Sequence, residues 1–404
     1  MNRIRRARRL GSRDVIQSML ARNQIDRREF LRRVGAGGVL MLGGPALLAA
    51  CGGDEGGGSN SLFVDNWILY IDCLINDDGS EDCGVHPTID AFTAETGIAV
   101  TYTEGVNSNE DWFGKYQSQL AAGQPIGIDV AMLTDHYAAR MIRLGYVEEL
   151  DKSNIPNAAN LVTGLQNKPF DPNRDFTLPW QSFFTGIGYD IDQTGREITS
   201  LRDLLDPAFA GKVGLLEGYD DTLTIFLLME GKNPETASVD DYVNAAGQVK
   251  EAIDSGQIRD VYGNDYIDAL LSGDLAISLA YSGDVVVSQA DAPNIRFAFP
   301  EEGVRIGTDN MLIPKGAANK ANAEAWMDFY YRPEIAAELA AYILYMTPVE
   351  GAREAIAAID PALADEPLIF PDESVLTKAF GLKSFTDEEE ELTVANAFAT
   401  AAGL

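Results

Sequence analysis

The alternation of apolar and polar positions is regular from residue 62 onward and predicts alternating strands and helices. Leu62 to Tyr70 (LFVDNWILY) is an apolar, aromatic-rich run typical of a strand, and residues 98–102 and 128–133 have the same character. Between them, residues 88–97 and 109–122 carry apolar side chains at the spacing of one helical face. This order, with short connections, predicts a parallel α/β sheet, in which ligands bind beyond the carboxyl ends of the strands.

The remaining pattern predicts a second unit of the same class. Three prolines and a run of aromatic residues in 167–190 indicate a strand that leaves the first unit. Residues 200–299 again read as α/β, and 300–314 (PEEGVRIGTDNMLIP) have glycines that allow a return crossover. Two lobes also fit the length, since roughly 340 residues exceed what one core usually organises. We expect residues 62–182 and 308–345 in the first lobe, and residues 183–307 and 346–404 in the second lobe.

The first 50 residues have a different pattern, that of an export signal. Arg27 and Arg28 stand in an R-R-x-F-L setting, the apolar run Val34 to Ala50 follows, and small residues precede Cys51. This predicts a twin-arginine lipoprotein signal over 1–50, cleavage before a lipid-modified Cys51, and a flexible tether over 51–61. The alternative is an uncut membrane anchor, although an apolar run of about 17 residues is marginal for a permanent span.

Charge narrows the choice of partners. The chain has 31 basic and 62 acidic residues, of which the first 50 hold 11 and 3, so that 20 and 59 remain and the formal net charge becomes −39. Nucleic acid is excluded as a partner, because neutralising phosphates needs clustered Lys and Arg. A cationic ligand would be attracted by such a field. The alternative, acidity that serves solubility alone, stays open.

Two cysteines remain once Cys51 is assigned to lipid. Cys73 and Cys83 lie in a Gly- and Asp-rich loop, and in an oxidising compartment we expect them to form a disulfide. The alternative zinc site would need more ligands than His86, the nearest histidine. The chain contains no G-x-S-x-G, no H-E-x-x-H and no Gly-rich phosphate loop. We therefore expect no metal, no cofactor and no catalytic activity.

Five short blocks of the body resemble one known family. The longest and most specific is NKPFDPN-x-D at residues 167–175. The blocks resemble the spermidine- and putrescine-binding lipoproteins and periplasmic proteins that deliver polyamines to ABC importers, and the likeness extends over residues 62 to about 348. The other blocks are NW-x-x-Y at Asn66 to Tyr70, F-T-x-E-T-G-I-x-V at Phe92 to Val100, P-E-E-G at Pro300 to Gly303 and R-P-E-I-A at Arg332 to Ala336.

The resemblance implies a type II periplasmic-binding-protein fold, in which two α/β lobes close like a hinge on two chain crossovers. It also implies an aromatic cage, a polar wall and two carboxylates that converge from both lobes on a polyamine. Carboxylates would pair with the ammonium ends and aromatic rings would cover the methylene spacers. Carried over position by position, the ligand-binding residues are Trp67, Tyr70, Thr134, His136, Asp221, Tyr281, Asp309 and Tyr345, with Asp220 as a neighbour of Asp221.

The sequence departs from the family pattern at two positions. A second carboxylate expected before Asp221 aligns with Gly218, and an indole expected before Asp309 aligns with Gly307. His136 stands where the family usually has tyrosine. These departures leave the length of the ligand open.

Six of the eight predicted site residues also have a purely structural interpretation. Trp67 is then a core residue, Tyr281 and Tyr345 pack against apolar runs, and His136 is a loop histidine. Asp309 is then part of a turn and Asp221 a helix N-cap. The pair Tyr330-Tyr331 is similar to tyrosines that bind ferric iron in other binding proteins, but core packing is favoured there.

The expected function is that of an exported, lipid-anchored, monomeric solute receptor on the outer face of the cytoplasmic membrane. It would capture a polyamine of the putrescine and spermidine class and present it to an ABC transporter permease. Three alternatives remain: a receptor for another cation or a ferric chelate, an extracellular hydrolase, and a structural or adhesive lipoprotein.

Overall fold

The structure is a computed structural model that describes residues 60–76, 80–263, 265–289, 292–385 and 387–404. The predicted signal over 1–50, most of the tether and the predicted lipidation site Cys51 lie outside these residues.

A ten-stranded sheet runs through the molecule in the order β4-β1-β5-β11-β6-β9-β7-β8, with β10 paired to β6 and β12 paired to β11. β1 pairs in parallel with β4 and β5, and β7 pairs in parallel with β8 and β9, which confirms the predicted α/β class. The short strands β2 and β3 form a separate hairpin. The strands are β1 Ser61–Trp67, β2 Leu74–Ile75, β3 Glu81–Asp82, β4 Ala99–Val106, β5 Val130–Thr134, β6 Thr177–Asp190, β7 Val213–Leu216, β8 Ile258–Tyr262, β9 Ile277–Tyr281, β10 Ile295–Ala298, β11 Val304–Leu312 and β12 Ala379–Phe380.

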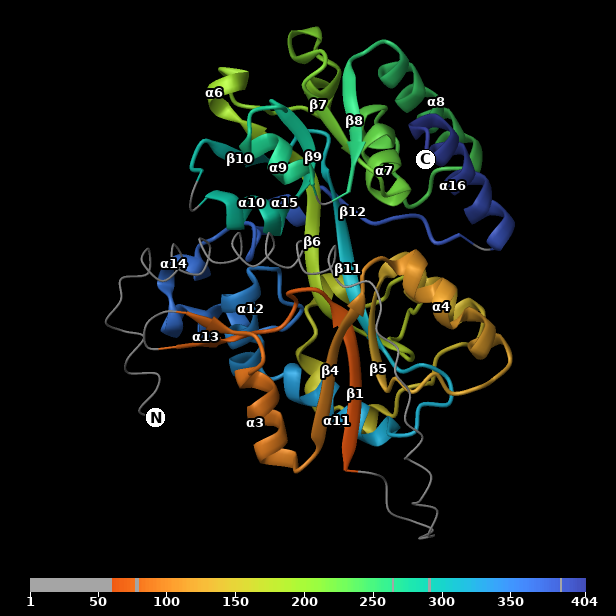
Figure 1. Cartoon of the computed structure of the whole chain (residues 1–404), viewed down its shortest axis with the longest axis vertical. Coiled ribbons are helices and arrows are strands. Elements are labelled where there is room, and N and C mark those ends of the chain that lie inside the picture. The colour runs from red at the N-terminus through yellow and green to blue at the C-terminus, as the bar shows by residue number, and fades with distance from the viewer. Residues whose placement is uncertain (1–59, 77–79, 264, 290–291, 386) are drawn as a thin grey trace, which may run out of the picture.

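The two long strands β6 and β11 connect the two halves of the sheet. They run antiparallel at the centre of the molecule, with the β1, β4 and β5 group at one end and the β7, β8 and β9 group at the other (Figure 1). β5 flanks β11 only over Asp309–Leu312, and β9 flanks β6 only over Thr185–Tyr189. β6 and β11 are therefore the two crossovers between the lobes.

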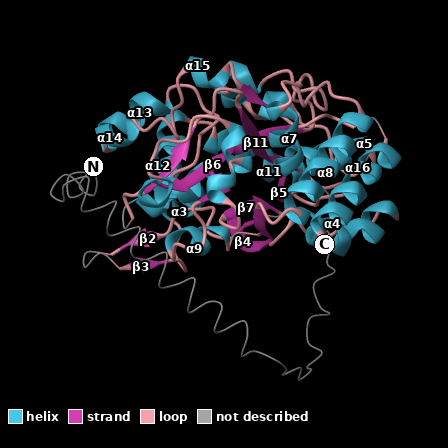
Figure 2. Cartoon of the chain, turned by 90° about the horizontal axis from the view of Figure 1, so that it is seen from above, coloured by secondary structure: helices cyan, strands magenta, loops and turns pink. Residues whose placement is uncertain are grey.

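Helices surround the sheet, as the end-on view shows (Figure 2). Their ends carry ordinary capping chemistry: the α4 helix begins after Ser108, whose hydroxyl accepts a hydrogen bond from the Asp111 amide, and α3 ends at Gly97 in the left-handed conformation. The α-helices are α3 Pro87–Thr96, α4 Asn109–Ala121, α5 Asp135–Arg143, α6 Ile191–Thr194, α7 Tyr219–Met229, α8 Val239–Asp254, α9 Tyr266–Leu271, α10 Ser282–Gln289, α11 Lys320–Tyr330, α12 Pro333–Ile343, α13 Ala352–Ile359, α14 Pro361–Ala364, α15 Glu373–Leu376 and α16 Glu388–Ala402.

Each lobe has its own buried apolar cluster. In the first lobe β1 and β5 pack against α3, α11 and α12, with Trp180, Trp326 and Tyr330 in ring contact at the centre. In the second lobe β7 and β9 pack against α7, α8 and α16. The predicted division of the chain between residues 345 and 346 stays a prediction. In the segment that follows it, side chains from 349–369 pack in the first cluster, and side chains from 385–401 pack in the second cluster.

The predicted disulfide between Cys73 and Cys83 is present. It closes the loop that carries the β2–β3 hairpin, directly after the end of β1.

Candidate functional site

The candidate site lies where β6 and β11 pass from one lobe to the other. Alternate residues of a strand point to the same face, and the register pairs Gln181 with Asp309, Phe183 with Gly307 and Thr185 with Arg305. We call these six residues the cleft row. The row runs from the first lobe, at Asp309, to the second lobe, at Arg305.

Asp309 is the centre of the first-lobe end of the row. The Tyr70 hydroxyl donates to its Oδ2 at 3.1 Å, and the Thr134 hydroxyl donates to its Oδ1 at 2.8 Å. Asn109 in turn donates to the Thr134 hydroxyl at 3.0 Å, which holds that side chain in place. The Tyr70 and Tyr345 rings meet edge to face with their centroids 5.0 Å apart. Four predicted residues therefore contact one another here.

Asp221 is the centre of the second-lobe end. Its Oδ1 accepts the Thr185 hydroxyl at 2.5 Å, and its Oδ2 accepts the Tyr281 hydroxyl at 2.9 Å. Arg305 places Nη1 2.9 Å from Asp221 Oδ1 and Nη2 2.5 Å from Asp220 Oδ2. The Arg305 guanidinium is 2% exposed, so this end of the site is a buried group of one cation and two carboxylates.

Burial and charge act differently on the three acids. Burial raises the pKa of Asp309 to about 6, although the hydrogen bonds from Thr134 and Tyr70 work against it. Burial also raises the pKa of Asp221, because it outweighs the opposing effect of Arg305. Burial opposes the charged form of Asp220 as well, but Arg305 and His136 prevail there and lower its pKa. Asp309 and Asp221 are thus the acids whose charge is least compensated.

Phe183 connects the aromatic residues of the two ends. Its ring meets Tyr281 edge to face at 5.4 Å and Tyr345 at 6.4 Å. Burial and the neighbouring Asp309 raise the pKa of Tyr70 well above its ordinary value, and burial and Asp221 do the same for Tyr281. Both hydroxyls therefore stay protonated and act as donors to the carboxylates.

The two glycines at the family departures are explained by their surroundings. A Cβ at Gly307 would lie 2.5 Å from the Phe183 ring and 2.6 Å from Arg305 Nη1, so these two side chains fill the place where an indole was expected. A Cβ at Gly218 would lie 2.8 Å from Asp221 Oδ2 and 2.9 Å from Asp220 Oδ1. The second carboxylate of this lobe is therefore supplied by Asp220.

Trp67 and His136 lie differently from the other predicted residues. Trp67 ends β1, and its indole Nε1 is buried with no hydrogen-bond partner in the described part of the chain. His136 is in the first turn of α5, so its interpretation as a loop histidine is wrong. Its Nδ1 lies 3.6 Å from Asp220 Oδ2, and its ring packs against Tyr137 and Tyr219. It therefore faces the second-lobe acids, across from its own lobe.

The structure also decides three other structural interpretations. Asp309 is inside β11 and not in a turn, and Asp221 is the third residue of α7, whose N-cap is Gly218. Tyr330 and Tyr331 are buried in the first-lobe cluster, which confirms core packing.

Sequence reasoning missed Arg305, Phe183, Thr185 and Gln181. The signal for Arg305 was its spacing of two and four residues from Gly307 and Asp309, which places all three on one face of a strand. Gln181 is 2% exposed, and its Oε1 has no hydrogen-bond partner within the described residues. It is a buried acceptor directly opposite Asp309 in the strand register.

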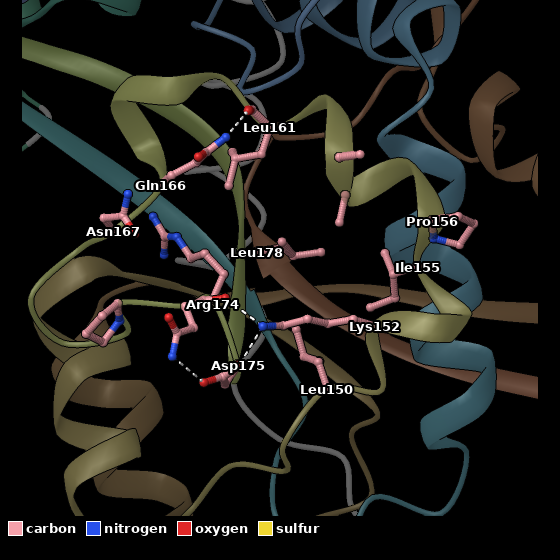
Figure 3. A pocket seen from close by; sticks show the side chains of 14 residues that line it. Leu150, Lys152, Ile155, Pro156, Leu161, Gln166, Asn167, Arg174, Asp175 and Leu178 are labelled. Atoms are coloured by element: carbon pink, nitrogen blue, oxygen red, sulfur yellow. Dashed lines mark hydrogen bonds and ion pairs between the residues drawn. The ribbon is translucent and has the colours of Figure 1, made fainter.

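A cavity of about 660 Å³ lies apart from these residues, in the segment that leads into β6 (Figure 3). It is bordered by the NKPFDPN-x-D block and by Lys152, whose Nζ lies 2.5 Å from Oδ1 of Asp175, the last residue of the block. Arg174 is buried beside it and donates to the Leu165 carbonyl and to Asn310 Oδ1. Because Asn310 follows Asp309, this block anchors the strand that carries the candidate site.

The described residues contain neither a metal-binding cluster nor a helix that could span a membrane. In residues 60–404 without their gaps, no group of three or more His, Cys, Asp or Glu side chains has a metal-binding arrangement. Over the same residues, no helix has the length and apolar character needed to cross a membrane.

Comparisons with known proteins agree with one another. The model of the bacterial extracellular solute-binding proteins matches residues 88–371. The chain is 26% identical over 346 residues to the spermidine/putrescine-binding periplasmic protein of Escherichia coli K12, covering 85% of this chain and 91% of that protein. It is 27% identical over 357 residues to the putrescine-binding periplasmic protein PotF of the same organism, covering 84% and 90%. The solved spermidine/putrescine ABC transporter substrate-binding protein PotD of Streptococcus pneumoniae superimposes with a TM-score of 0.70 at 23% identity, covering 85% of this chain and 98% of that one.

Proposed function

Because the chain belongs to the bacterial extracellular solute-binding proteins, we propose that it captures a polyamine of the putrescine and spermidine class and delivers it to an ABC importer. The observation that carries this proposal is the pair of buried, undercompensated carboxylates at the two ends of one aromatic-lined row, Asp309 in the first lobe and Asp221 in the second. The names of the relatives that cover most of the chain support the same ligand class.

The two ends of the row fit the two ends of an alkyl diamine. An ammonium beside Asp309 would pair with a carboxylate that already accepts two hydroxyl donors, and the buried Gln181 Oε1 offers a further acceptor. A second ammonium would pair with Asp221 next to Tyr281. Each ion pair would be strong because these carboxylates are 5% and 4% exposed, respectively.

The rings between the two ends fit the apolar spacer. Tyr345, Phe183 and Tyr281 form a continuous series of edge-to-face contacts from one lobe to the other. Such faces cover methylene groups and attract ammonium groups, with about 1–2 kcal/mol for each dry cation-π contact. The side chains come from both lobes, so that capture and closure of the lobes are one event.

Isothermal titration calorimetry with putrescine, cadaverine, spermidine and spermine tests this function. Asp309→Asn and Asp221→Asn should each weaken binding of the preferred polyamine at least tenfold, because truncating a buried charge partner costs about 2–5 kcal/mol. Asp254→Asn is the matched control, since that side chain is 62% exposed on α8 and its loss should leave affinity unchanged. Unchanged affinity in both site variants would remove the site assignment.

The proposal includes the location of the protein. We propose export by the twin-arginine route and a lipid anchor at Cys51 that holds a monomeric receptor at the outer face of the cytoplasmic membrane. The R-R-x-F-L setting and the small residues before Cys51 support it. Mass spectrometry of membrane fractions should find a diacylated amino terminus at Cys51, and an intact Met1 terminus would contradict it. A receptor needs no catalytic step, and we propose none.

A further inference from the structure

Arg305 adds a positive charge to the cleft row, beside Asp220 and Asp221 of the second lobe. Its side chain is 2% exposed, and its guanidinium is held by Asp221 Oδ1 at 2.9 Å and Asp220 Oδ2 at 2.5 Å. The Phe183 ring lies 5.6 Å from it. Since the guanidinium is charged at all ordinary pH values, the position that a ligand cation would seek in the second lobe is partly taken by the protein itself.

We propose that Arg305 replaces one ammonium of a longer polyamine, so that the cleft selects short diamines over triamines. This inference rests on the proposed function, because it concerns which polyamine the same site takes. Arg305 is then a specificity-determining residue, and it acts both through the charge it adds and through the length it occupies.

The charges in the cleft fit a dication. Asp220, Asp221 and Asp309 carry three negative charges and Arg305 carries one positive charge, so these four buried side chains have a net charge of −2 when ionised. The nearby Asp135 is not counted in this sum, because the charge of the buried Arg174 acts on it. Asn310 lies between the two, donating to Asp135 Oδ1 at 2.8 Å and accepting from Arg174 Nη1 at 3.1 Å. A diamine with two ammonium groups neutralises this net charge of −2. A triamine would leave one positive charge in excess in a buried site.

The length available along the row also fits a diamine. Arg305 Nη1 would lie only 2.6 Å from a Cβ at Gly307, so the guanidinium lies over the middle of the row. From Gly307 to Asp309 is two residues of strand, or about 7 Å. The third amine of a longer ligand would have to occupy the place where Arg305 pairs with Asp220 and Asp221.

A different role for Arg305, binding the carboxylate of an amino acid ligand, is opposed by its contacts. Both of its terminal nitrogens already face carboxylates of the protein. A ligand carboxylate would add a fourth negative charge beside Asp220 and Asp221. 4-Aminobutyrate, which has a carboxylate where putrescine has an aminomethyl group, distinguishes the two roles directly.

The test is a comparison of dissociation constants for putrescine, spermidine and 4-aminobutyrate by calorimetry. In the unchanged protein, putrescine should bind at least tenfold more tightly than spermidine, and 4-aminobutyrate should bind at least a hundredfold more weakly than putrescine. In Arg305→Gln, the ratio of the spermidine to the putrescine dissociation constant should fall by at least tenfold. Without the Arg305 charge, the three carboxylates can pair with three positive charges of the ligand. Spermidine should then also raise the melting temperature of this variant more than putrescine does, which is measurable even if the variant is less stable.

A double variant serves as the matched control. Arg305→Gln combined with Asp220→Asn removes one charge of each sign, so the net charge of the site is again −2. The preference for putrescine should therefore return. Equal affinity of the unchanged protein for putrescine and spermidine would overturn the inference without any variant. The inference would also be overturned if the ratio of the spermidine to the putrescine dissociation constant in Arg305→Gln stayed within threefold of the ratio in the unchanged protein. Tight binding of 4-aminobutyrate would overturn it as well. Failure of the unchanged protein to bind any polyamine would instead contradict the proposed function.

Discussion

Asp309 receives hydrogen bonds from Tyr70 and Thr134 but forms no ion pair within the described residues. A buried carboxylate in that situation is costly to ionise, and burial accordingly raises the pKa of Asp309 to about 6. Its raised pKa means that the folded protein gains stability from Asp309 as the pH falls from about 6 toward the ordinary value near 4, where the unfolded chain also becomes protonated. A bound ammonium has the opposite preference, since it stabilises the ionised form.

We therefore predict that affinity for a diamine depends on pH through Asp309. Below about pH 6 the free protein holds a proton on Asp309 that must leave when the cation binds, so affinity should fall by up to tenfold per pH unit. Above pH 6 affinity should level off. Burial raises the pKa of Asp221 too and adds a dependence of the same sign. Calorimetry from about pH 5 to pH 8, in buffers of different ionisation enthalpy, measures both affinity and the protons released.

Two results decide this prediction. In Asp309→Asn the remaining affinity should depend less on pH and fewer protons should be released at about pH 5.5. The other charged or titratable groups that act on Asp309 are Tyr70, Asp135 and Arg305, and the pKa of Tyr70 is raised, so that it does not titrate in this range. Affinity that is constant from pH 8 to pH 5 would contradict the assignment of Asp309 as an ammonium partner.

At the residue scale, the sequence predicted the residues that contact Asp309 better than the residues that contact Asp221. Tyr70 follows the end of β1 and Thr134 is the last residue of β5, a place where ligand contacts are expected in any parallel sheet. Arg305 and Thr185 are in the crossover strands themselves, and their contact depends on the β6–β11 register. That register is set by pairing between residues about 120 positions apart in the chain, as for Arg305 and Thr185, and no local pattern encodes it.

Salt bridges join two helices of different lobes, α5 and α16. Arg143 of α5 contacts Glu391 of α16 at 2.7 Å and also donates to the Phe385 carbonyl, and Arg140 contacts Glu388 at 2.7 Å. The helix α5 follows β5 of the first lobe, whereas α16 packs on α8 of the second lobe. Glu391 is 6% exposed, so this pair is partly buried and more than a surface contact. The two helices form a latch between the lobes.

We predict that Arg143→Ala weakens polyamine binding about threefold to tenfold through the dissociation rate. The Arg143–Glu391 contact joins the two lobes, so its loss favours their separation and speeds ligand release. Stopped-flow measurement of binding and release checks this. Arg332→Ala is the matched control, because Arg332 pairs with Glu95 at the same 2.7 Å distance but joins α12 to α3 within the first lobe. An equal effect of both variants on release would contradict a latch.

At the element scale, the periodic elements of the first lobe were all predicted, the two helices to within one residue at each end and the strands with larger errors at their ends. The α3, α4, β1, β4 and β5 segments have clear apolar periodicity and distinct ends. The sequence did not predict β8, whose middle residues are exposed and carry no alternation, nor α5, which begins immediately at the end of β5. The latch between α5 and α16 joins residues 248 positions apart, and only the assembled fold brings them together.

The excess of acidic residues acts on the whole molecule. From Cys51 onward the chain holds 59 acidic and 20 basic residues, and only three of these acids, Asp220, Asp221 and Asp309, are placed in the candidate site. The rest produce a field that extends about a Debye length from the surface and attracts cations before any contact forms. Charge pairs formed with the buried carboxylates Asp309 and Asp221 are screened far less. The field and the site should therefore respond differently to salt.

We predict that salt slows association of the ligand and leaves its dissociation almost unchanged. Between about 50 mM and 500 mM sodium chloride, the association rate constant for putrescine should fall several-fold, because long-range attraction is screened. The dissociation rate constant should change less than twofold, since it reports the buried contacts of Asp309 and Asp221. Stopped-flow fluorescence measures both constants, with Trp67 at the end of β1 as the expected reporter.

The charge of the ligand provides the internal control. Spermidine carries one more positive charge than putrescine, so its association rate should depend more steeply on salt even though it is expected to bind more weakly. Parallel slopes for the two ligands, or association rates that do not change with salt, would mean that the acidic surface serves solubility and does not guide the ligand. The same comparison separates the two parts of the mechanism, because selection at Arg305 acts after encounter and should appear in dissociation.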